Sequence, residues 1–450
     1  MIRRFVEREL RAWLKSADYR PIVLAGAPLT GKTTLVREFS RHEGRSLREI
    51  NLAQHRAALG QVFASRDIGA ICDALSKIAG ASVDAPDSML LLDNIQACPE
   101  AFDALPDFNT RREALPVFAV SSGIDVSRVP EHFATPLFIG PLSFGEFLQA
   151  VDAALVPFFE DLADGRTIPE AAHHRLFERL RAYLLVGGMP QAVEAYASTM
   201  SFERAHEAHG LIYKTLRERV SHLAEPGKLR TALRALLLKT PNHMDFPFRP
   251  EEVVRKGTPP EVVSEALRIF HGLGFVVPCE ARSCETPQLF PPGSSFDVLA
   301  YGWKCFYFDT GLVSYLCGID PAALATLTDM RLVDNCPLAE QFAAQQLFFR
   351  TGVFFRQPRL ACWNGDPDIN FVASTRQGVV PIVIRATLYD GQEDSEPLLR
   401  ARRGSLAVRL CASLPEQDSF QPDRRNDPAR RCLLQSVPLY MAERLFAEEQ

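Results

Sequence analysis

The segment that most restricts the fold is PIVLAGAPLTGKTTL, residues 21–35, in which a short apolar run leads into a glycine-containing loop. The residues from Gly26 to Thr33 fit the pattern GxxxxGK[ST], the Walker A motif. The apolar run is typical of a buried strand, and TTLVREFSRH after the loop has the spacing of an amphipathic helix. A strand, this loop and a helix in that order predict a backbone cradle for a phosphate group. The alternative is a surface turn that happens to contain two glycines.

The residue types in this loop match the needs of a nucleotide's phosphate chain. Glycine at positions 26 and 31 lets backbone N–H groups turn inward, because no Cβ blocks the turn. Lys32 brings a positive charge to the phosphate oxygens, and Thr33 offers a hydroxyl ligand to Mg²⁺. We therefore expect ATP and Mg²⁺ to bind here. The expected nucleotide-binding residues are Gly26, Ala27, Pro28, Leu29, Thr30, Gly31, Lys32, Thr33 and Thr34.

A second metal ligand is expected at the end of another buried strand, where the apolar run in MLLLDNIQ ends at Asp93. Thr33 and Asp93 are the predicted metal ligands, although an Asp at a strand end also commonly caps a turn. In P-loop ATPases with an inserted strand, the next residue is usually a Glu that orients and polarises the attacking water. Here it is Asn94, which can hold a water but cannot take its proton, so we expect slow turnover. Glu100 is too far from the strand end to be a good substitute.

Ser121 and Ser122 follow the apolar run ALPVFAV and are candidate catalytic residues together with Asn94. From an adjacent strand, their hydroxyls would lie near the terminal phosphate of ATP. Serines at strand ends also cap turns, and the sequence does not separate these two interpretations.

Helix and strand patterns divide the chain into four expected parts. Strand-like runs alternate with helical patterns to about residue 145, which predicts an α/β domain with a parallel sheet covered on both faces. A helical stretch follows, and then two short helices, a longer helix with Thr258 as its N-cap and a hairpin suggest a winged helix. The expected division is a P-loop domain at 1–146, a helical lid at 147–222, a winged-helix region at 223–284 and an α+β domain at 285–450.

Composition excludes several classes of protein. The net charge of −5 is not the profile of a protein that coats nucleic acid or an anionic membrane. No apolar run approaches the roughly 20 residues that span a bilayer, and charges interrupt the N-terminal stretch where a signal peptide would be apolar. The ten cysteines form no CxxC pair, so we expect reduced thiols used as small apolar residues and a cytoplasmic location.

Several short sequence segments along the chain, the Walker A loop among them, are informative when they are considered together. They are GAPLTGKTTL, LLLDNIQ, PLSFGEFL, YLLVGGMPQAV, KCFYFDTGLVSYLCGI, LAEQFAAQQL, PDINFV, PIVIRA and VPLYMAERL. With these strings the chain resembles a bacterial and archaeal family of AAA-type P-loop ATPases with a C-terminal restriction-endonuclease-like domain of unknown function. The resemblance implies an ATP-binding core, a helical lid, a winged helix and a nuclease-like domain. It leaves oligomerisation open.

The chain departs from this family at several positions. Pro28 and Leu29 stand where many members have an Arg, and the Gly-Arg that usually precedes PLSF is missing. Arg128 lies close by, and no role follows for it. Relative to the family's nuclease strings, the acidic string corresponds to Asp368, Ile369, Asn370 and Phe371, and the later Glu-x-Lys string to Val383, Ile384 and Arg385. Only Glu340 and Asp368 keep carboxylates, so we do not expect nuclease activity.

DNA binding by the winged helix is not favoured. Its candidate recognition helix begins TPPEVVSEALR, which puts Glu261 and Glu265 where phosphates would approach, one turn before Arg268. A packing or protein-contact role is the simpler interpretation. His206 and His209 have i, i+3 spacing without a third ligand and are interpreted as surface histidines.

We therefore expect a cytoplasmic Mg-ATP-binding protein that acts as a nucleotide-dependent switch with slow or absent hydrolysis. The alternatives are a non-catalytic scaffold that binds protein partners through its C-terminal domains, and a DNA-associated ATPase.

Overall fold

The computed structural model describes most of the chain. The described residues are 2–16, 20–110, 115–121, 133–244, 246–282, 289–291, 296–300, 302–322, 337–349, 359–363, 369–375, 378–385, 406–420 and 432–446. Ser122, Arg128 and Asp368 lie outside them. Among the described residues, no helix is both long enough and apolar enough to cross a lipid bilayer.

A five-stranded parallel sheet forms the N-terminal part, as the alternating pattern predicts. Its strands are β1 (Ile22–Ala25), β2 (Ser46–Asn51), β3 (Ser88–Asp93), β4 (Val117–Val120) and β5 (Thr135–Phe138). Their order is β2-β3-β4-β1-β5, and every pairing is parallel. Strand β4 therefore lies between β1, which leads into the Walker A loop, and β3, which ends at Asp93.

Helices cover both faces of this sheet. Alternate strand residues point to opposite sides, so a strand with apolar residues at successive positions needs cover on both faces. Val23 and Ala25 pack with α3 (Leu52–Ala64), α4 (Ile68–Ala79) and α5 (Pro99–Asp103). Ile22 and Leu24 pack with α1 (Glu7–Lys15) and α2 (Lys32–His42). Two 3-10 helices, η1 (Ile95–Ala97) and η2 (Leu105–Thr110), flank α5. Strands β1, β3 and β4 are buried on both faces for this reason.

Helices α6 to α10 follow the sheet. They are α6 (Phe144–Val151), α7 (Val156–Ala163), α8 (Glu170–Val186), α9 (Pro190–Thr199) and α10 (Phe202–His222), with 3-10 helix η4 (Ala153–Leu155) before α7. Helix α8 ends before Gly187, whose φ of +67° favours glycine. The interpretation of His209 as a surface residue is wrong, because it faces the apolar side of α10 and is buried, whereas His206 is exposed.

The next region contains the helices and the hairpin that the sequence suggests. They are α11 (Lys228–Lys239), 3-10 helix η5 (Thr240–Asn242), α12 (Pro250–Val253), α13 (Pro260–Gly272), β6 (Val276–Arg282) and β7 (Trp303–Tyr307). The prediction that Thr258 is the N-cap of this helix is wrong, because Pro259 is the N-cap residue of α13. The Thr258 hydroxyl instead donates to the Arg255 carbonyl.

The hairpin strands belong to a second, eight-stranded mixed sheet. Its other strands are β8 (Leu360–Trp363), β9 (Phe371–Thr375), β10 (Gly378–Arg385), β11 (Leu406–Cys411), β12 (Glu416–Phe420) and β13 (Cys432–Pro438). The strand order is β12-β13-β11-β10-β9-β8-β6-β7. Strand β6 lies before the expected domain boundary at residues 284 and 285 and β7 lies after it, so one sheet contains strands from both expected domains. Helices α14 (Thr310–Cys317) and α16 (Leu338–Phe348) and 3-10 helix η7 (Leu439–Arg444) complete this part.

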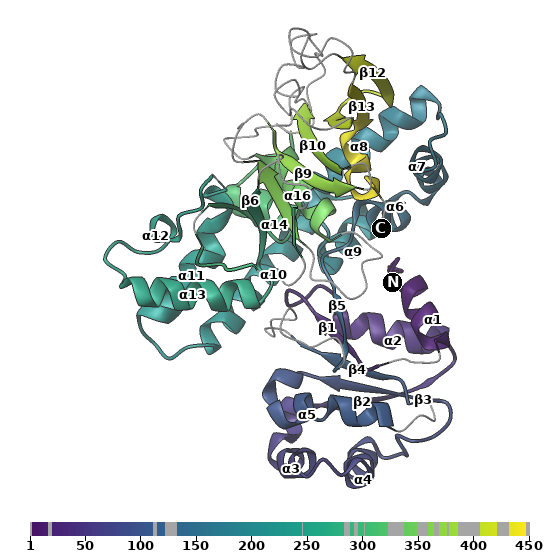
Figure 1. The fold of residues 1–450 in the computed structure, drawn as a ribbon, viewed down its shortest axis with the longest axis vertical. Helices are drawn as coiled ribbons and strands as arrows, with labels where there is room; N and C mark the ends of the chain where they lie inside the picture. The colour runs from purple at the N-terminus through teal and green to yellow at the C-terminus, as the bar shows by residue number, and fades with distance from the viewer. Residues whose placement is uncertain are drawn as a thin grey trace.

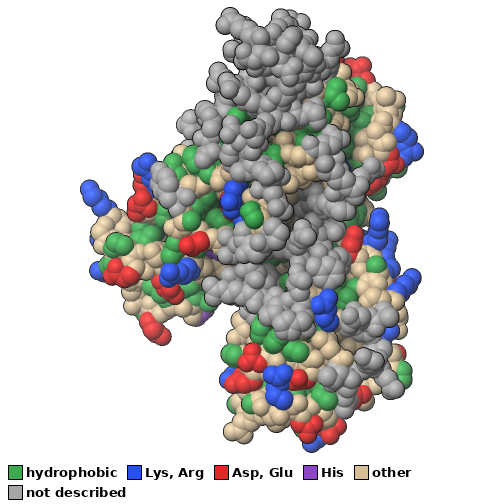
Figure 2. Space-filling model, viewed as in Figure 1, with side chains coloured by type: hydrophobic (Ala, Val, Ile, Leu, Met, Phe, Trp, Pro, Cys, Tyr) green, Lys and Arg blue, Asp and Glu red, His purple; other side chains and the backbone are tan. Residues whose placement is uncertain are grey.

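One hydrophobic core joins helices α6 to α10 to the second sheet, and the first sheet has its own cores on its two faces. In Figure 1 the first sheet and its helices lie at the bottom, the second sheet lies above it, and α11 and α13 project to the left. The N-terminal and C-terminal ends lie close together beside α6. On the face shown in Figure 2, acidic and basic side chains of the described residues are intermixed over the first-sheet part and over the α11 to α13 part.

Candidate nucleotide-binding site

The Walker A loop connects β1 to α2 and has the backbone geometry of an anion cradle. Gly26, Leu29 and Gly31 have φ values of +129°, +67° and +89°, so left-handed residues alternate with others along the loop. A Cβ on Gly26 would lie 2.2 Å from the Ile139 carbonyl oxygen. Gly26 is therefore required both by its φ and by the close approach of the strand β5 end.

Lys32 is buried at the start of α2 and folds over the loop. Its Nζ donates to the carbonyl oxygens of Gly26 at 2.9 Å and Ala27 at 2.8 Å. Burial, together with the Arg219 charge, lowers the pKa of Lys32 to about 7, and the Asp93 charge opposes this shift. The ammonium thus lies in a site where added negative charge would favour its protonated form.

Thr33 and Asp93, the two expected metal ligands, lie in contact. The Thr33 hydroxyl donates to Asp93 Oδ2 at 3.3 Å. Two neighbouring ligands of an octahedral Mg²⁺ ion, each about 2.1 Å from the metal, are about 3.0 Å apart, so this pair fits a shared ion. The described residues contain no group of three or more His, Cys, Asp or Glu side chains that could hold a metal alone. Mg²⁺ usually takes one or two protein ligands and completes its shell with phosphates and water, and the Thr33–Asp93 pair supplies that number.

Asn94 follows Asp93 in a left-handed conformation with φ +57°, which Asn tolerates better than most residues. Its backbone N–H donates to Asp93 Oδ1 at 2.8 Å, and its side-chain Nδ2 donates to Asn51 Oδ1 at 3.3 Å. Asn51 lies on β2 directly opposite Asp93 and also caps α3. The Asn94 amide is therefore held between two strand ends.

Glu100 does not supply the missing carboxylate. Its Oε1 accepts from Arg56 Nη2 at 2.7 Å, and hydrogen bonds from its own backbone and from Arg56 lower its pKa. Arg56 belongs to α3, so this ion pair fastens the α5 segment to α3 and occupies the carboxylate.

Ser121 lies at the end of β4, beside the strand that leads into the loop. Its N–H donates to the Leu24 carbonyl at 2.9 Å. Its hydroxyl is fully buried and has no hydrogen-bond partner among the described residues. A buried hydroxyl without a partner is uncommon, and its place beside the loop fits contact with a ligand. Nothing is placed for Ser122, which falls in the undescribed range 122–132.

The remaining predicted loop residues differ in exposure. Ala27, Pro28 and Thr30 are buried, and the Thr30 hydroxyl donates to the Ala27 carbonyl at 2.9 Å. Leu29 is half-buried and Thr34 is exposed.

Three residues from outside the first-sheet part approach the loop, and sequence reasoning missed their role. A Cβ on Gly31 would lie 3.5 Å from Cγ of Pro190, the first residue of α9. A Cβ on Gly274, in the turn between α13 and β6, would lie 3.0 Å from the Ala27 backbone nitrogen. The third is Arg219 on α10, which acts on Lys32 through its charge. No local pattern marks Arg219 or Gly274, because only the tertiary fold brings them to the loop.

The strings GGMP and YFDTGL contact each other next to the place where Pro190 approaches Gly31. The buried Asp309 accepts from the backbone N–H groups of Gly188 at 2.7 Å and Leu312 at 2.8 Å. Burial raises its pKa to about 6, although the backbone hydrogen bonds oppose this. A Cβ on Gly311 would lie 2.4 Å from the Val186 carbonyl group, so α14 packs directly on the end of α8. This junction fixes the place where α9 begins at the loop.

The described positions that the expected resemblance aligns with a nuclease site make contacts within the fold. Asn370 Oδ1 accepts from the Ile384 backbone N–H at 2.8 Å, and Val383 is fully buried. Arg385 Nη1 donates to the Ile384 carbonyl at 3.0 Å, and Glu340 pairs with Lys304 at 2.6 Å.

Comparisons with known proteins agree with the loop geometry. Residues 18–148 match the model of an AAA domain, and residues 177–323 match a domain of unknown function (DUF8612). No curated protein matches the chain.

Two solved structures are similar to parts of the chain. The Walker-type ATPase PABY2304 of Pyrococcus abyssi is 14% identical, with 70% of this chain and 96% of that chain covered and a TM-score of 0.42. A structure describing the basis of katanin self-assembly is 14% identical, with 33% of this chain and 50% of that chain covered and a TM-score of 0.23. The match to the AAA model, with the strand order and the loop, supports an AAA-type P-loop nucleotide-binding domain at residues 18–148.

Proposed function

We propose that this chain is a cytoplasmic Mg-ATP-binding switch in which the bound nucleotide sets the position of the lid helices, with slow or absent hydrolysis. One observation carries the proposal: the cradle at 26–31, the buried Lys32 and the Thr33–Asp93 pair converge at one edge of a parallel sheet. Brought together in this order, these groups match a triphosphate and its Mg²⁺ ion.

The chain's own residues would hold the ligand in distinct ways. The loop backbone would donate N–H groups to the phosphates, and Lys32 would exchange its hydrogen bonds to Gly26 and Ala27 for phosphate oxygens. Thr33 and Asp93 would hold Mg²⁺, which neutralises phosphate charge when bound. Ser121 would donate its buried hydroxyl to a phosphate oxygen.

Slow hydrolysis follows from the position after Asp93. General-base assistance contributes roughly 10²–10⁴ in rate, and the Asn94 amide cannot provide it. The Asn94 side chain is also bonded to Asn51, and Glu100 is bonded to Arg56. Bound ATP would thus persist long enough to hold one conformation.

The switch is supported by the contacts that the loop makes with distant segments. Pro190 from α9 and Gly274 from the α13–β6 turn approach its backbone, and Arg219 from α10 brings a positive charge. A phosphate chain in the loop would attract Arg219 and press on the other two segments. Because the lid helices and the second sheet share one core, movement at α9 or α10 would be passed to the second sheet.

Binding of a fluorescent ATP analogue to the purified protein tests the proposal. We expect Mg²⁺-dependent binding that is lost in Lys32→Ala and kept in Lys77→Ala, a matched control at an exposed lysine on α4. Failure of the native protein to bind ATP in either the presence or absence of Mg²⁺ would end the proposal.

Turnover separates the slow-ATPase form of this proposal from a scaffold. Asn94→Glu should raise ATP hydrolysis, although φ +57° at this position costs a residue other than Asn or Gly about 1 kcal/mol. A non-catalytic scaffold that binds protein partners is the second candidate. The hydrogen bonds that Asn370 and Arg385 make to the Ile384 backbone favour it, at positions that the resemblance aligns with a nuclease site. It predicts no turnover even with Glu at position 94.

A winged helix in the α11–β7 region and a restriction-endonuclease-like C-terminal domain remain part of this proposal. DNA association is the third candidate. The exposed Glu261 and Glu265 on α13 argue against it, since both would repel phosphates. A duplex-DNA shift assay at low salt, where cationic contacts are strongest, tests it.

A further inference from the structure

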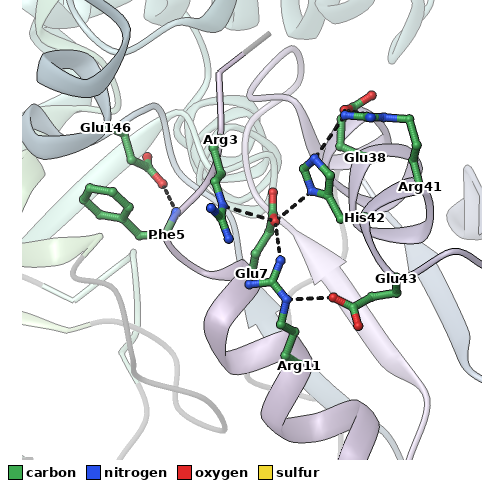
Figure 3. A network of polar contacts seen from close by, with 9 residues as sticks. All are labelled: Arg3, Phe5, Glu7, Arg11, Glu38, Arg41, His42, Glu43 and Glu146. Atoms are coloured by element: carbon green, nitrogen blue, oxygen red, sulfur yellow. Dashed lines mark hydrogen bonds and ion pairs between the residues drawn. The ribbon is translucent and has the colours of Figure 1, made fainter. Parts of the chain in front are cut away.

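The N-terminal segment, residues 2–16, lies against both ends of the helix that begins at the Walker A loop. Its helix α1 is fastened to the far end of α2 through the buried Glu7 carboxylate. Glu7 Oε2 contacts Arg11 Nη2 at 3.2 Å, His42 Nδ1 at 3.0 Å and Arg3 Nε at 3.6 Å (Figure 3). His42 is the last residue of α2.

The other end of this segment reaches the loop itself through Arg4. Its guanidinium donates from Nη1 to the Thr30 carbonyl at 3.0 Å and from Nη2 to the Gly140 carbonyl at 3.0 Å. A longer contact joins Nη2 to the Pro141 carbonyl at 3.5 Å, and Nε donates to Glu146 Oε1 at 3.1 Å. One side chain therefore links the Walker A loop, the segment between β5 and α6, and the first turn of α6.

The Arg4 charge is already balanced by a fixed carboxylate. The Glu146 side chain is only 2% exposed, and its Oε1 also accepts from the backbone N–H of Phe5 at 2.7 Å (Figure 3). Its Oε2 accepts from the backbone N–H of Ser143 at 3.0 Å. Ser143 and Glu146 form a capping box at the start of α6, so this carboxylate has a defined position. Arg4 consequently adds little net positive charge for a ligand, and its effect on the loop is geometric.

The geometry acts through one peptide plane. A trans peptide is planar, and its C=O and N–H point in opposite directions. The Thr30 carbonyl, held by Arg4, shares its peptide with the N–H of Gly31, whose φ of +89° makes this peptide one of the turning points of the cradle. Holding the carbonyl toward Arg4 therefore aims the Gly31 N–H away from it, to the opposite side of the loop.

We propose that Arg4 is a positioning residue for nucleotide binding: it fixes the Thr30–Gly31 peptide of the phosphate loop and ties the loop to residues 140–146, which lead into α6. This inference rests on the proposed function, since it assumes that the loop binds ATP. Through the same guanidinium, a change in the loop reaches α6 without passing through the sheet.

The test compares ATP binding by Arg4→Ala, Arg4→Lys and the native protein, with Arg8→Ala as a matched control. Arg8 lies on the same segment and is exposed. We expect the Kd for a fluorescent ATP analogue with Mg²⁺ to rise tenfold or more in Arg4→Ala and by a smaller factor in Arg4→Lys, and to stay within twofold in Arg8→Ala. Millimolar guanidinium should restore part of the affinity of Arg4→Ala, whereas sodium at the same ionic strength should not.

Each outcome decides the matter. If both Arg4 variants fold and bind ATP with the native affinity, or if guanidinium restores nothing while affinity falls only in step with thermal stability, the positioning role is refuted. Should Arg4→Ala not fold, Arg4→Lys decides, because a lysine can reach fewer of the four acceptors. If the native protein itself binds no ATP, the proposed function fails first, and that result is distinct from a native-like Arg4 variant.

Discussion

Proton uptake on ATP binding follows from the state of Lys32. Burial and the Arg219 charge place its pKa at about 7, so at pH 8 about nine-tenths of the molecules carry a neutral Lys32. Contact with phosphate oxygens would return the pKa toward its ordinary value of about 10.4. Binding at pH 8 should then take up about 0.9 proton per ATP, and Kd should rise about tenfold per pH unit between pH 7 and 10.

Isothermal titration calorimetry in buffers of different ionisation enthalpy measures the number of protons taken up. The observed binding heat varies linearly with the buffer's ionisation enthalpy, and the slope gives that number. A phosphate with a second pKa of about 6 is already ionised at pH 8, so the uptake reports the protein. The Arg219→Gln variant is the control: without this charge the Lys32 pKa rises, and uptake at pH 8 should fall. Uptake near zero at both pH 8 and pH 9, with a Kd that does not change between them, would refute the reasoning.

The same lysine influences stability with a definite sign. Between pH 7 and about 10 the unfolded chain binds more protons at this group than the folded protein does, so Lys32 makes the free energy of unfolding rise with pH. Below pH 7 its unfavourable contribution is constant.

Three further predictions concern other parts of the molecule. Gly311→Ala should lower the free energy of unfolding by about 2–3 kcal/mol in urea titrations, because its Cβ would meet the end of α8, whereas Gly210→Ala on α10 should be neutral or slightly stabilising. Burial lowers the pKa of His209 to about 4, so stability should fall by up to about 3 kcal/mol as pH drops from 6.5 to 4, and His209→Gln should unfold in urea with a smaller difference between pH 7 and pH 4.5. Glu100→Gln should leave steady-state ATP turnover unchanged, since Arg56 already holds this carboxylate; a large loss would give Glu100 a role in hydrolysis.

Much of the first-sheet part was predictable because its signals are local. The Walker A pattern places a strand, a loop and a helix within a few residues, and the structure has β1, the left-handed loop positions and α2 there. The apolar run before Asp93 likewise predicts a buried strand, and the Thr33–Asp93 contact follows from parallel strands whose ends share one edge of the sheet.

Other predictions failed or stayed open where packing overrode a local pattern. Thr258 is a favourable N-cap residue, yet its hydroxyl donates to the Arg255 backbone carbonyl and α13 begins after Pro259. The i, i+3 spacing of His206 and His209 does not reveal that only His209 faces the core. Burial is decided by what covers a helix face, and the sequence of that helix does not contain this information.

The sequence alone determined which residues can cradle a phosphate and hold a metal, because glycine, lysine, threonine and aspartate have that chemistry wherever they lie. The tertiary structure decided which distant groups act on the cradle. Arg4, Arg219 and Gly274 reach the loop only because separate helices and turns pack around it. A contact across some 25 to 250 residues depends on the packing of whole elements, for which the amino acids beside the loop carry no local signal.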